Sequence, residues 1–145
     1  MFKVKIIAVG KLKEPWLQAA IGEYEKRLQG RCLLEWLIAE DDKELLSFAA
    51  KQPLLIALDP KGELLNSETF SEKLTNLGAR AAFAIGGPDG LPPEVTRAAR
   101  FRWSLSPLTL TNQMVRLILV EQLYRALEIA RGSPYHKYTA PGQKM

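Results

Sequence analysis

Five short apolar runs, each followed by a segment with helical spacing or a turn that leads into one, constrain this chain more than any other feature. The runs predict strands over residues 2–9, 32–38, 54–58, 81–85 and 101–105. Helices are predicted to start near Pro15, Asp41 or Asp42, Asn66 or Ser67, Pro92 or Pro93, and Thr111. Because near-continuous apolar strands are typical of a sheet covered on both faces, the alternation predicts an α/β fold, a three-layer sandwich with a mostly parallel five-stranded sheet.

Two loops in the second half of the chain have features of a ligand site. The glycine loop, residues 86–91, combines three glycines with Pro88, and the leucine loop, residues 105–110, mixes apolar side chains with hydroxyls and has no charge. Both loops follow predicted parallel strands, so they should open at one sheet edge, where open α/β sheets bind ligands. On spacing alone, a tight turn and ordinary core leucines are the favoured interpretation of these loops.

The predicted helix over residues 111–131 is apolar over an arc of about 200°, wider than the stripe of about 100° that one packing partner needs. It is either a central helix of its own domain or the interface of a homodimer, and the small size of the chain favours the dimer. Arg116 falls near the middle of this arc. Since an unpaired buried charge is costly, Arg116 needs a carboxylate such as Asp89, carbonyl oxygens, or an anionic ligand.

Composition narrows the class of protein without identifying it. With 145 residues, the chain is expected to form a single domain, residues 1–145. Twenty basic and sixteen acidic residues give a net charge of +4, which mildly favours a polyanionic partner. Cys32 is the only cysteine, so an intrachain disulfide and a cysteine zinc cluster are excluded. No apolar run has the length of a membrane span and no signal peptide is recognisable, which predicts a cytoplasmic protein.

Several motifs in fixed order resemble the RlmH-type methyltransferases of the SPOUT superfamily. They are Ile85–Leu91, Trp103–Ser106, Leu108–Leu110, Val115-Arg116, Glu121–Arg125 and Pro134–Lys137. The similarity extends from Val9-Gly10-Lys11 to Lys137. It implies a homodimeric enzyme that uses S-adenosylmethionine, without a metal, to methylate N3 of a pseudouridine in bacterial large-subunit rRNA on the assembled ribosome. Neither membrane nor DNA is among the implied partners.

The resemblance also implies a C-terminal trefoil knot and roles for individual residues. The cofactor would be bound by Leu58, Gly86, Gly87, Leu105, Ser106, Pro107, Leu108, Thr109 and Leu110. The catalytic residues would be Arg116, in an electrostatic role, Tyr135, stacking on the target base, and His136, bonding the base or accepting its proton. The segment that carries Tyr135 and His136 would fold over the cofactor pocket of the neighbouring subunit, with Lys137 contacting phosphate.

Two departures from the family pattern affect these expectations. Asn112 stands where most relatives have a histidine, so a mechanism that relies on a catalytic base at that position cannot be assigned to this chain. Residues 138–145 extend beyond the usual end of the family and are expected to form a flexible tail.

Two alternatives remain at this point. One is a non-enzymatic doubly wound module that holds a nucleotide or phosphate in the glycine loop, although the chain lacks Gly-x-Gly-x-x-Gly and a Walker lysine. The other is a SPOUT methyltransferase that acts on a different RNA.

Overall fold

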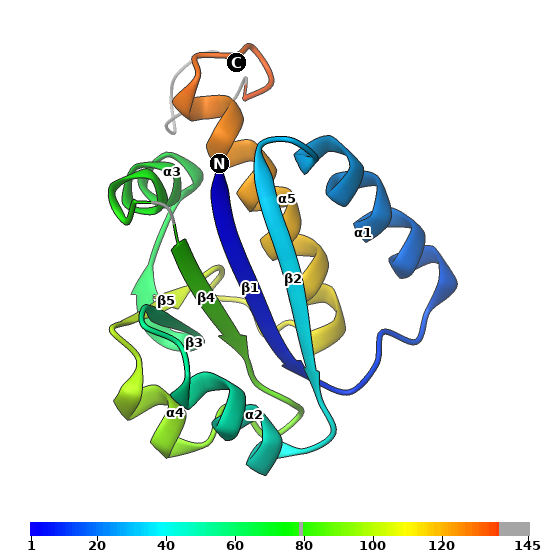
Figure 1. Cartoon of the computed structure of the whole chain (residues 1–145), viewed down its shortest axis with the longest axis vertical. Helices are drawn as coiled ribbons and strands as arrows, with labels where there is room; N and C mark the ends of the chain where they lie inside the picture. The colour runs from blue at the N-terminus through cyan, green and yellow to red at the C-terminus, as the bar shows by residue number, and fades with distance from the viewer. Residues whose placement is uncertain (79, 137–145) are drawn as a thin grey trace.

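The computed structural model describes residues 1–78 and 80–136. Over these residues five strands alternate with five helices (Figure 1). The elements are β1 (Phe2–Val9), α1 (Pro15–Leu28), β2 (Cys32–Ala39), α2 (Asp42–Ala50), β3 (Leu55–Leu64), α3 (Ser67–Asn76), β4 (Arg80–Ile85), α4 (Pro93–Ala98), β5 (Phe101–Ser104) and α5 (Asn112–Ala130). The expected tail at 138–145 and the expected phosphate contact of Lys137 lie outside the described residues.

The five strands form one sheet in the order β2-β1-β4-β3-β5, and every pairing is parallel. Helices α1, α3 and α5 pack against one face, while α2 and α4 cover part of the other (Figure 1). Side chains of β1 point to both faces of the sheet: Val4 and Ile6 pack toward α5, and Ile7 packs toward α2. The predicted three-layer α/β sandwich is therefore confirmed.

Local capping decides where the helices start. The Asp41 carboxylate accepts a hydrogen bond from the Glu44 amide at 2.9 Å, and the Asn66 side chain accepts one from the Thr69 amide at 2.8 Å. Thr111 caps α5 in the same way, through the Met114 amide at 3.2 Å. These side chains satisfy amides that have no partner inside the helix. The structure thus selects Asp41 and Asn66 where the sequence left two residues open.

Strand β3 is longer than predicted. The strand was predicted over residues 54–58 and is followed by Asp59-Pro60-Lys61-Gly62, a composition typical of a turn, but β3 continues to Leu64, and its register against β5 shifts between Leu58 and Glu63. Asp59 accepts from Arg102 at 2.8 Å, which holds the displaced segment against β5. A Cβ on Gly62 would lie 2.5 Å from the carbonyl oxygen of Arg102. The turn signal is real, but it produces a bulge within a strand.

The larger core lies between the sheet and helices α1, α3 and α5. Phe70 of α3, Phe83 of β4 and Trp103 of β5 form an aromatic cluster, with ring centroids 5.7 to 6.3 Å apart. Helix α5 packs against both α1 and α3, which accounts for much of its wide apolar arc within a single chain. Cys32 is buried, and burial raises the pKa of its thiol to about 11.

Glu128 anchors the C-terminal end of α5. Its buried carboxylate accepts from Arg131 at 2.7 Å and from Ser133 at 3.0 Å, and it pairs with Arg31 of the α1–β2 turn at 2.8 Å. The hydrogen bond from Arg131, with those from Ser133 and Arg31, outweighs burial and lowers the pKa of Glu128 from 4.5 to about 2. This carboxylate therefore fixes the segment that follows α5 to the rest of the domain.

The lowered pKa of Glu128 predicts acid sensitivity. Its stabilising contribution is complete above pH 4.5 and is lost as the pH falls toward about 2, because the folded state binds this proton more weakly than the unfolded state. Glu128→Gln should lower stability at neutral pH by roughly 2 kcal/mol and flatten the pH dependence in this window. Thermal unfolding followed by circular dichroism across the window measures both effects. Glu23→Gln, which breaks an exposed pair with Arg27, is the control, and equal pH dependence in all three proteins would contradict the prediction.

Candidate functional site

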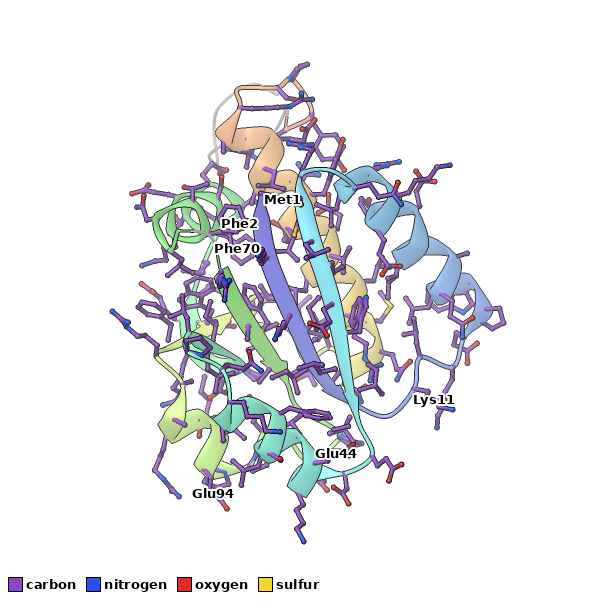
Figure 2. The ribbon with its side chains drawn as sticks, in the orientation of Figure 1. Met1, Phe2, Lys11, Glu44, Phe70 and Glu94 are labelled. Carbon is purple, nitrogen blue, oxygen red and sulfur yellow. The ribbon has the colours of Figure 1, made fainter. Side chains whose placement is uncertain are left out.

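A cleft of about 530 Å³ lies where β3, β4 and β5 end and α5 begins. Its position agrees with the rule that open parallel sheets bind ligands beyond the carboxyl ends of their strands. In Figure 2, Lys11, after β1, and Glu44 and Glu94, at the starts of α2 and α4, mark this end of the molecule. Of the predicted cofactor residues, all but Pro107 line the cleft: Leu58, Gly86, Gly87, Leu105, Ser106, Leu108, Thr109 and Leu110.

The glycine loop is a tight turn in which Gly86 and Gly90 require glycine for different reasons. The Gly90 amide donates to the Gly87 carbonyl at 3.0 Å, and Gly90 has a φ of +82°, which favours glycine. A Cβ on Gly86 would lie 2.5 Å from the carbonyl carbon of Gly90, so Gly86 is needed for the loop itself to close. A Cβ on Gly87 would meet only Val9, at 3.9 Å. Gly87 therefore presents an open face to a ligand and, unlike Gly90, has no positive φ that would itself require glycine.

Hydrogen bonds of Ser104, at the end of β5, and of Ser106 fix the conformation of the leucine loop. The Ser104 hydroxyl donates to the Ser106 carbonyl at 3.0 Å, and the Ser106 hydroxyl accepts from the Leu108 amide at 2.9 Å. Leu108 is 70% exposed, which is unusual for a leucine beside a cleft. A fixed backbone and an open apolar side chain suit a flat heteroaromatic ring that is bound by main-chain groups.

An ion pair forms the charged wall of the cleft. Arg102 of β5 donates to Asp59 at 2.8 and 3.2 Å, and the Lys61 amide donates to the same carboxylate at 2.9 Å. Burial disfavours the ionised form of Asp59, but the Lys61 amide and Arg102 outweigh it and hold the pKa of Asp59 below its usual range. Sequence analysis assigned no role to these residues, because their contact joins positions 43 apart.

Arg116 is one turn into α5, and the residue is 1% exposed. It donates from Nη2 to the Val9 carbonyl at 2.8 Å and to the Asn112 side chain at 3.3 Å. Its Nε and Nη1 are buried without a hydrogen-bond partner among the described residues, and burial lowers the pKa of Arg116. Of the partners predicted for Arg116, the structure shows a carbonyl oxygen, that of Val9. No ion pair between Arg116 and Asp89 is found in the described ranges.

Asn112 connects Arg116 with the cleft. It is one of the residues that line the cleft, and its Oδ1 accepts from the guanidinium below it. Its neighbour Gln113 accepts from the Lys13 amide at 3.2 Å and donates to the Lys11 carbonyl at 3.2 Å. The first turn of α5 is thereby tied to the loop after β1. A buried cation, two of whose nitrogens have no hydrogen-bond partner among the described residues, is held close behind the wall of the cleft.

Tyr135 and His136 follow the last turn of α5 and do not line this cleft. Tyr135 donates to Glu121 at 3.0 Å, and burial together with this bond raises its pKa above the ordinary value, so the phenol is a donor. His136 lines a smaller hollow of about 250 Å³, which shares Leu105 with the cleft. Within one chain the structure therefore gathers the predicted cofactor residues and leaves these two catalytic candidates outside.

Arg125 contacts both of these residues, and sequence analysis gave it no role. Its guanidinium carbon lies 4.9 Å from the centre of the Tyr135 ring, and its Nη1 is 2.8 Å from His136 Nδ1. It also pairs with Glu121, one turn earlier, at 3.2 Å. The i, i+4 spacing of Glu121 and Arg125 was the available signal, whereas the contact with His136 depends on how the chain folds back after the helix.

Solved methyltransferases have the same fold. A tRNA methyltransferase from Aquifex aeolicus superposes with a TM-score of 0.60 over 99% of this chain and 80% of that one, at 17% identity. A methyltransferase structure from Legionella pneumophila, in complex with its bound cofactor SAM, gives a TM-score of 0.51 over 89% of this chain and 66% of that one, at 13% identity. At these identities the similarity shows the fold alone, an α/β domain of the kind found in these proteins.

The sequence identifies the family. A family model described as "Predicted SPOUT methyltransferase" matches residues 2–136, and the chain belongs to this family. Relatives named "Ribosomal RNA large subunit methyltransferase H" include one from Protochlamydia amoebophila, 46% identical over 94% of this chain and 100% of the relative. Another, from Prochlorococcus marinus, is 45% identical over 93% of this chain and 96% of the relative. The predicted RlmH-type resemblance is confirmed, and the knot stays a prediction.

Gly86 and Gly87, which both line the cleft, predict different outcomes when a side chain is added. Gly87→Val should leave the fold intact, because its Cβ has space, and should weaken S-adenosylmethionine binding at least about tenfold by blocking backbone approach. Gly86→Ala should instead lower stability, by roughly 1–3 kcal/mol, because its Cβ meets the backbone of Gly90. Thermal unfolding and calorimetry with the cofactor separate the two effects. Unchanged affinity in Gly87→Val would remove the glycine loop from the site.

Proposed function

We propose that this protein transfers a methyl group from S-adenosylmethionine to N3 of a pseudouridine in large-subunit rRNA, acting on the assembled ribosome in the cytoplasm. The observation that carries the proposal is 46% identity over the full length of a relative named as a large-subunit rRNA methyltransferase. The cleft supports it independently, because the cleft combines an open glycine backbone with an uncharged apolar loop at the carboxyl edge of the sheet.

The cleft has the chemistry that the cofactor needs. The leucine loop and Leu58 offer apolar surface for the adenine ring, and the open face of Gly87 lets main-chain groups approach it. Pro107 belongs to the same loop and would stiffen it from outside the lining. The bound cofactor supplies an activated methyl sulfonium, so the protein has to align the acceptor and manage charge and the N3 proton.

Arg116 suits the electrostatic part of this task. Its guanidinium remains protonated in proteins, so it stabilises negative charge and does not accept the N3 proton. Two of its nitrogens are buried without a partner among residues 1–78 and 80–136, so it retains unused donors behind Asn112. A preorganised cation in a site with little water stabilises charge that develops on the base carbonyl oxygens.

Tyr135 and His136 enter the proposal through a homodimer. They lie outside the cleft of their own chain, so the tail of one subunit would have to meet the cleft of the other. Half-buried apolar side chains of α5 offer a packing surface for the second copy: Met114, Val115, Leu117, Ile118 and Leu127. In that arrangement Tyr135 stacks on the target base, and His136 bonds it or accepts its proton.

The function is tested by methylation of defined RNA substrates. Intact ribosomes, isolated large subunits and free rRNA from cells lacking the protein are incubated with labelled S-adenosylmethionine, and the product is mapped by mass spectrometry. We expect one methylated pseudouridine, formed fastest on intact ribosomes. Label in another RNA would indicate a different target. Failure to bind S-adenosylmethionine, together with no competition by the demethylated product, would indicate a non-enzymatic binding module.

Arg116→Met separates stability from turnover. Methionine has a similar length and no charge, and replacing a poorly paired buried charge by an apolar group is expected to change stability by no more than about 1 kcal/mol. Turnover should fall roughly 100-fold with cofactor affinity unchanged, because the lost cation acts on charge that develops during reaction. Arg80→Met, an exposed site at the start of β4, is the control. Full activity of Arg116→Met would return Arg116 to a purely structural role.

A further inference from the structure

His136 is held on both of its ring nitrogens by charged side chains from two helices. Its Nε2 is 2.9 Å from the carboxylate of Glu68, in the first turn of α3, and its Nδ1 is 2.8 Å from Nη1 of Arg125, on α5. The His136 side chain is only 9% exposed. The ring is therefore fixed in position and orientation although it lies in the segment that follows the last helix.

These two contacts determine which nitrogen carries the proton. A guanidinium has N–H donors and no acceptor, so His136 Nδ1 has to accept from Arg125 through its lone pair. The ring proton is then on Nε2, where the Glu68 carboxylate accepts it. The geometry defines the neutral Nε2–H tautomer and leaves Nδ1 as the basic nitrogen.

The same network orients Tyr135. Glu121 accepts from the Tyr135 hydroxyl at 3.0 Å and pairs with Arg125 at 3.2 Å, and Arg125 lies over the Tyr135 ring. Glu121 and Arg125 thus hold both aromatic residues from α5. Glu68 is different, because it comes from α3 and contacts His136 on the nitrogen opposite Arg125.

We propose that Glu68 is a positioning residue for His136. By accepting a hydrogen bond from Nε2–H, it holds the ring in the tautomer whose Nδ1 lone pair is available to the substrate. This proposal rests on the proposed function, in which His136 meets the target base. In the present conformation Arg125 covers Nδ1, and an RNA phosphate or base carbonyl that attracts the guanidinium would uncover it.

The proton step is balanced within this arrangement. The N3–H bond of the base breaks and an Nδ1–H bond forms, while the electron pair stays on N3, where the methyl group is accepted. His136 becomes an imidazolium, and the adjacent carboxylate of Glu68 stabilises its charge. A carboxylate that fixes the tautomer of a general-base histidine and then balances its charge is an established arrangement in enzymes.

The test uses the fact that His136 is the only histidine of the chain. In protein labelled with ¹⁵N-histidine, the wild type should show a protonated Nε2 whose proton exchanges slowly with water, and an unprotonated Nδ1. Glu68→Ala should lose the slow Nε2 proton, and its turnover on ribosomes should fall about tenfold or more while cofactor affinity stays within about twofold. Glu68→Gln keeps an acceptor, so it should retain the Nε2–H signal and part of the turnover.

Glu72→Ala is the matched control, since Glu72 is exposed one turn further along α3. It should leave the histidine spectrum and turnover unchanged. A proton on Nδ1 in the wild type would overturn the proposal. It would also be overturned if Glu68→Ala lost the Nε2 signal but remained fully active. A wild-type protein that methylates no RNA would overturn the proposed function, and the role of Glu68 with it, whereas an active wild type with an equally active Glu68→Ala overturns the role of Glu68 alone.

Discussion

The parallel pairing of β4, β3 and β5 is the constraint on which the site depends. Because these three neighbouring strands run in the same direction, the chain leaves all of them at one edge of the sheet. Leu58, the glycine loop and the leucine loop meet there because Leu58 lies on β3 and the two loops follow β4 and β5, and the Asp59–Arg102 pair adds a side-chain contact between β3 and β5. The start of α5 closes the cleft, since Gln113 ties it to the loop after β1. The arrangement of the strands therefore positions the cleft, and side chains such as Asp59 and Arg102 determine its charge.

Charge is distributed unequally over the two parts of the proposed active site. The lining of the cleft includes a compensated ion pair, Asp59 with Arg102, and Arg116 is buried behind it without a carboxylate partner among the described residues. The tail region has the opposite character, because Glu68, Glu121 and Glu128 each bind a cationic or aromatic group there. In the proposed dimer, an electropositive base-binding site would therefore meet a tail whose own cations are already paired.

Much of this structure was predictable from the sequence, because its signals are local. Apolar runs predicted the strands, capping residues predicted the helix starts, and the strand-end rule predicted the sheet edge at which the glycine loop and the leucine loop meet. The predictions stopped where a contact joins distant positions. Residues 59–62 form a bulge in which Asp59 contacts Arg102. Arg116 donates to the Val9 carbonyl, and His136 contacts Glu68, 68 positions earlier. No residue pattern along the chain encodes such pairs.

The hydrogen bond from Arg116 to the Val9 carbonyl joins the last helix to the first strand, across 107 positions. During synthesis, β1 is complete long before Arg116 emerges, and until then part of the sheet face that α1, α3 and α5 share lacks its last covering helix. Docking of α5 is consequently a late event that buries an apolar surface and a guanidinium together. A nascent chain that stalls before this helix would expose a flat hydrophobic face, the kind of surface on which chaperones act.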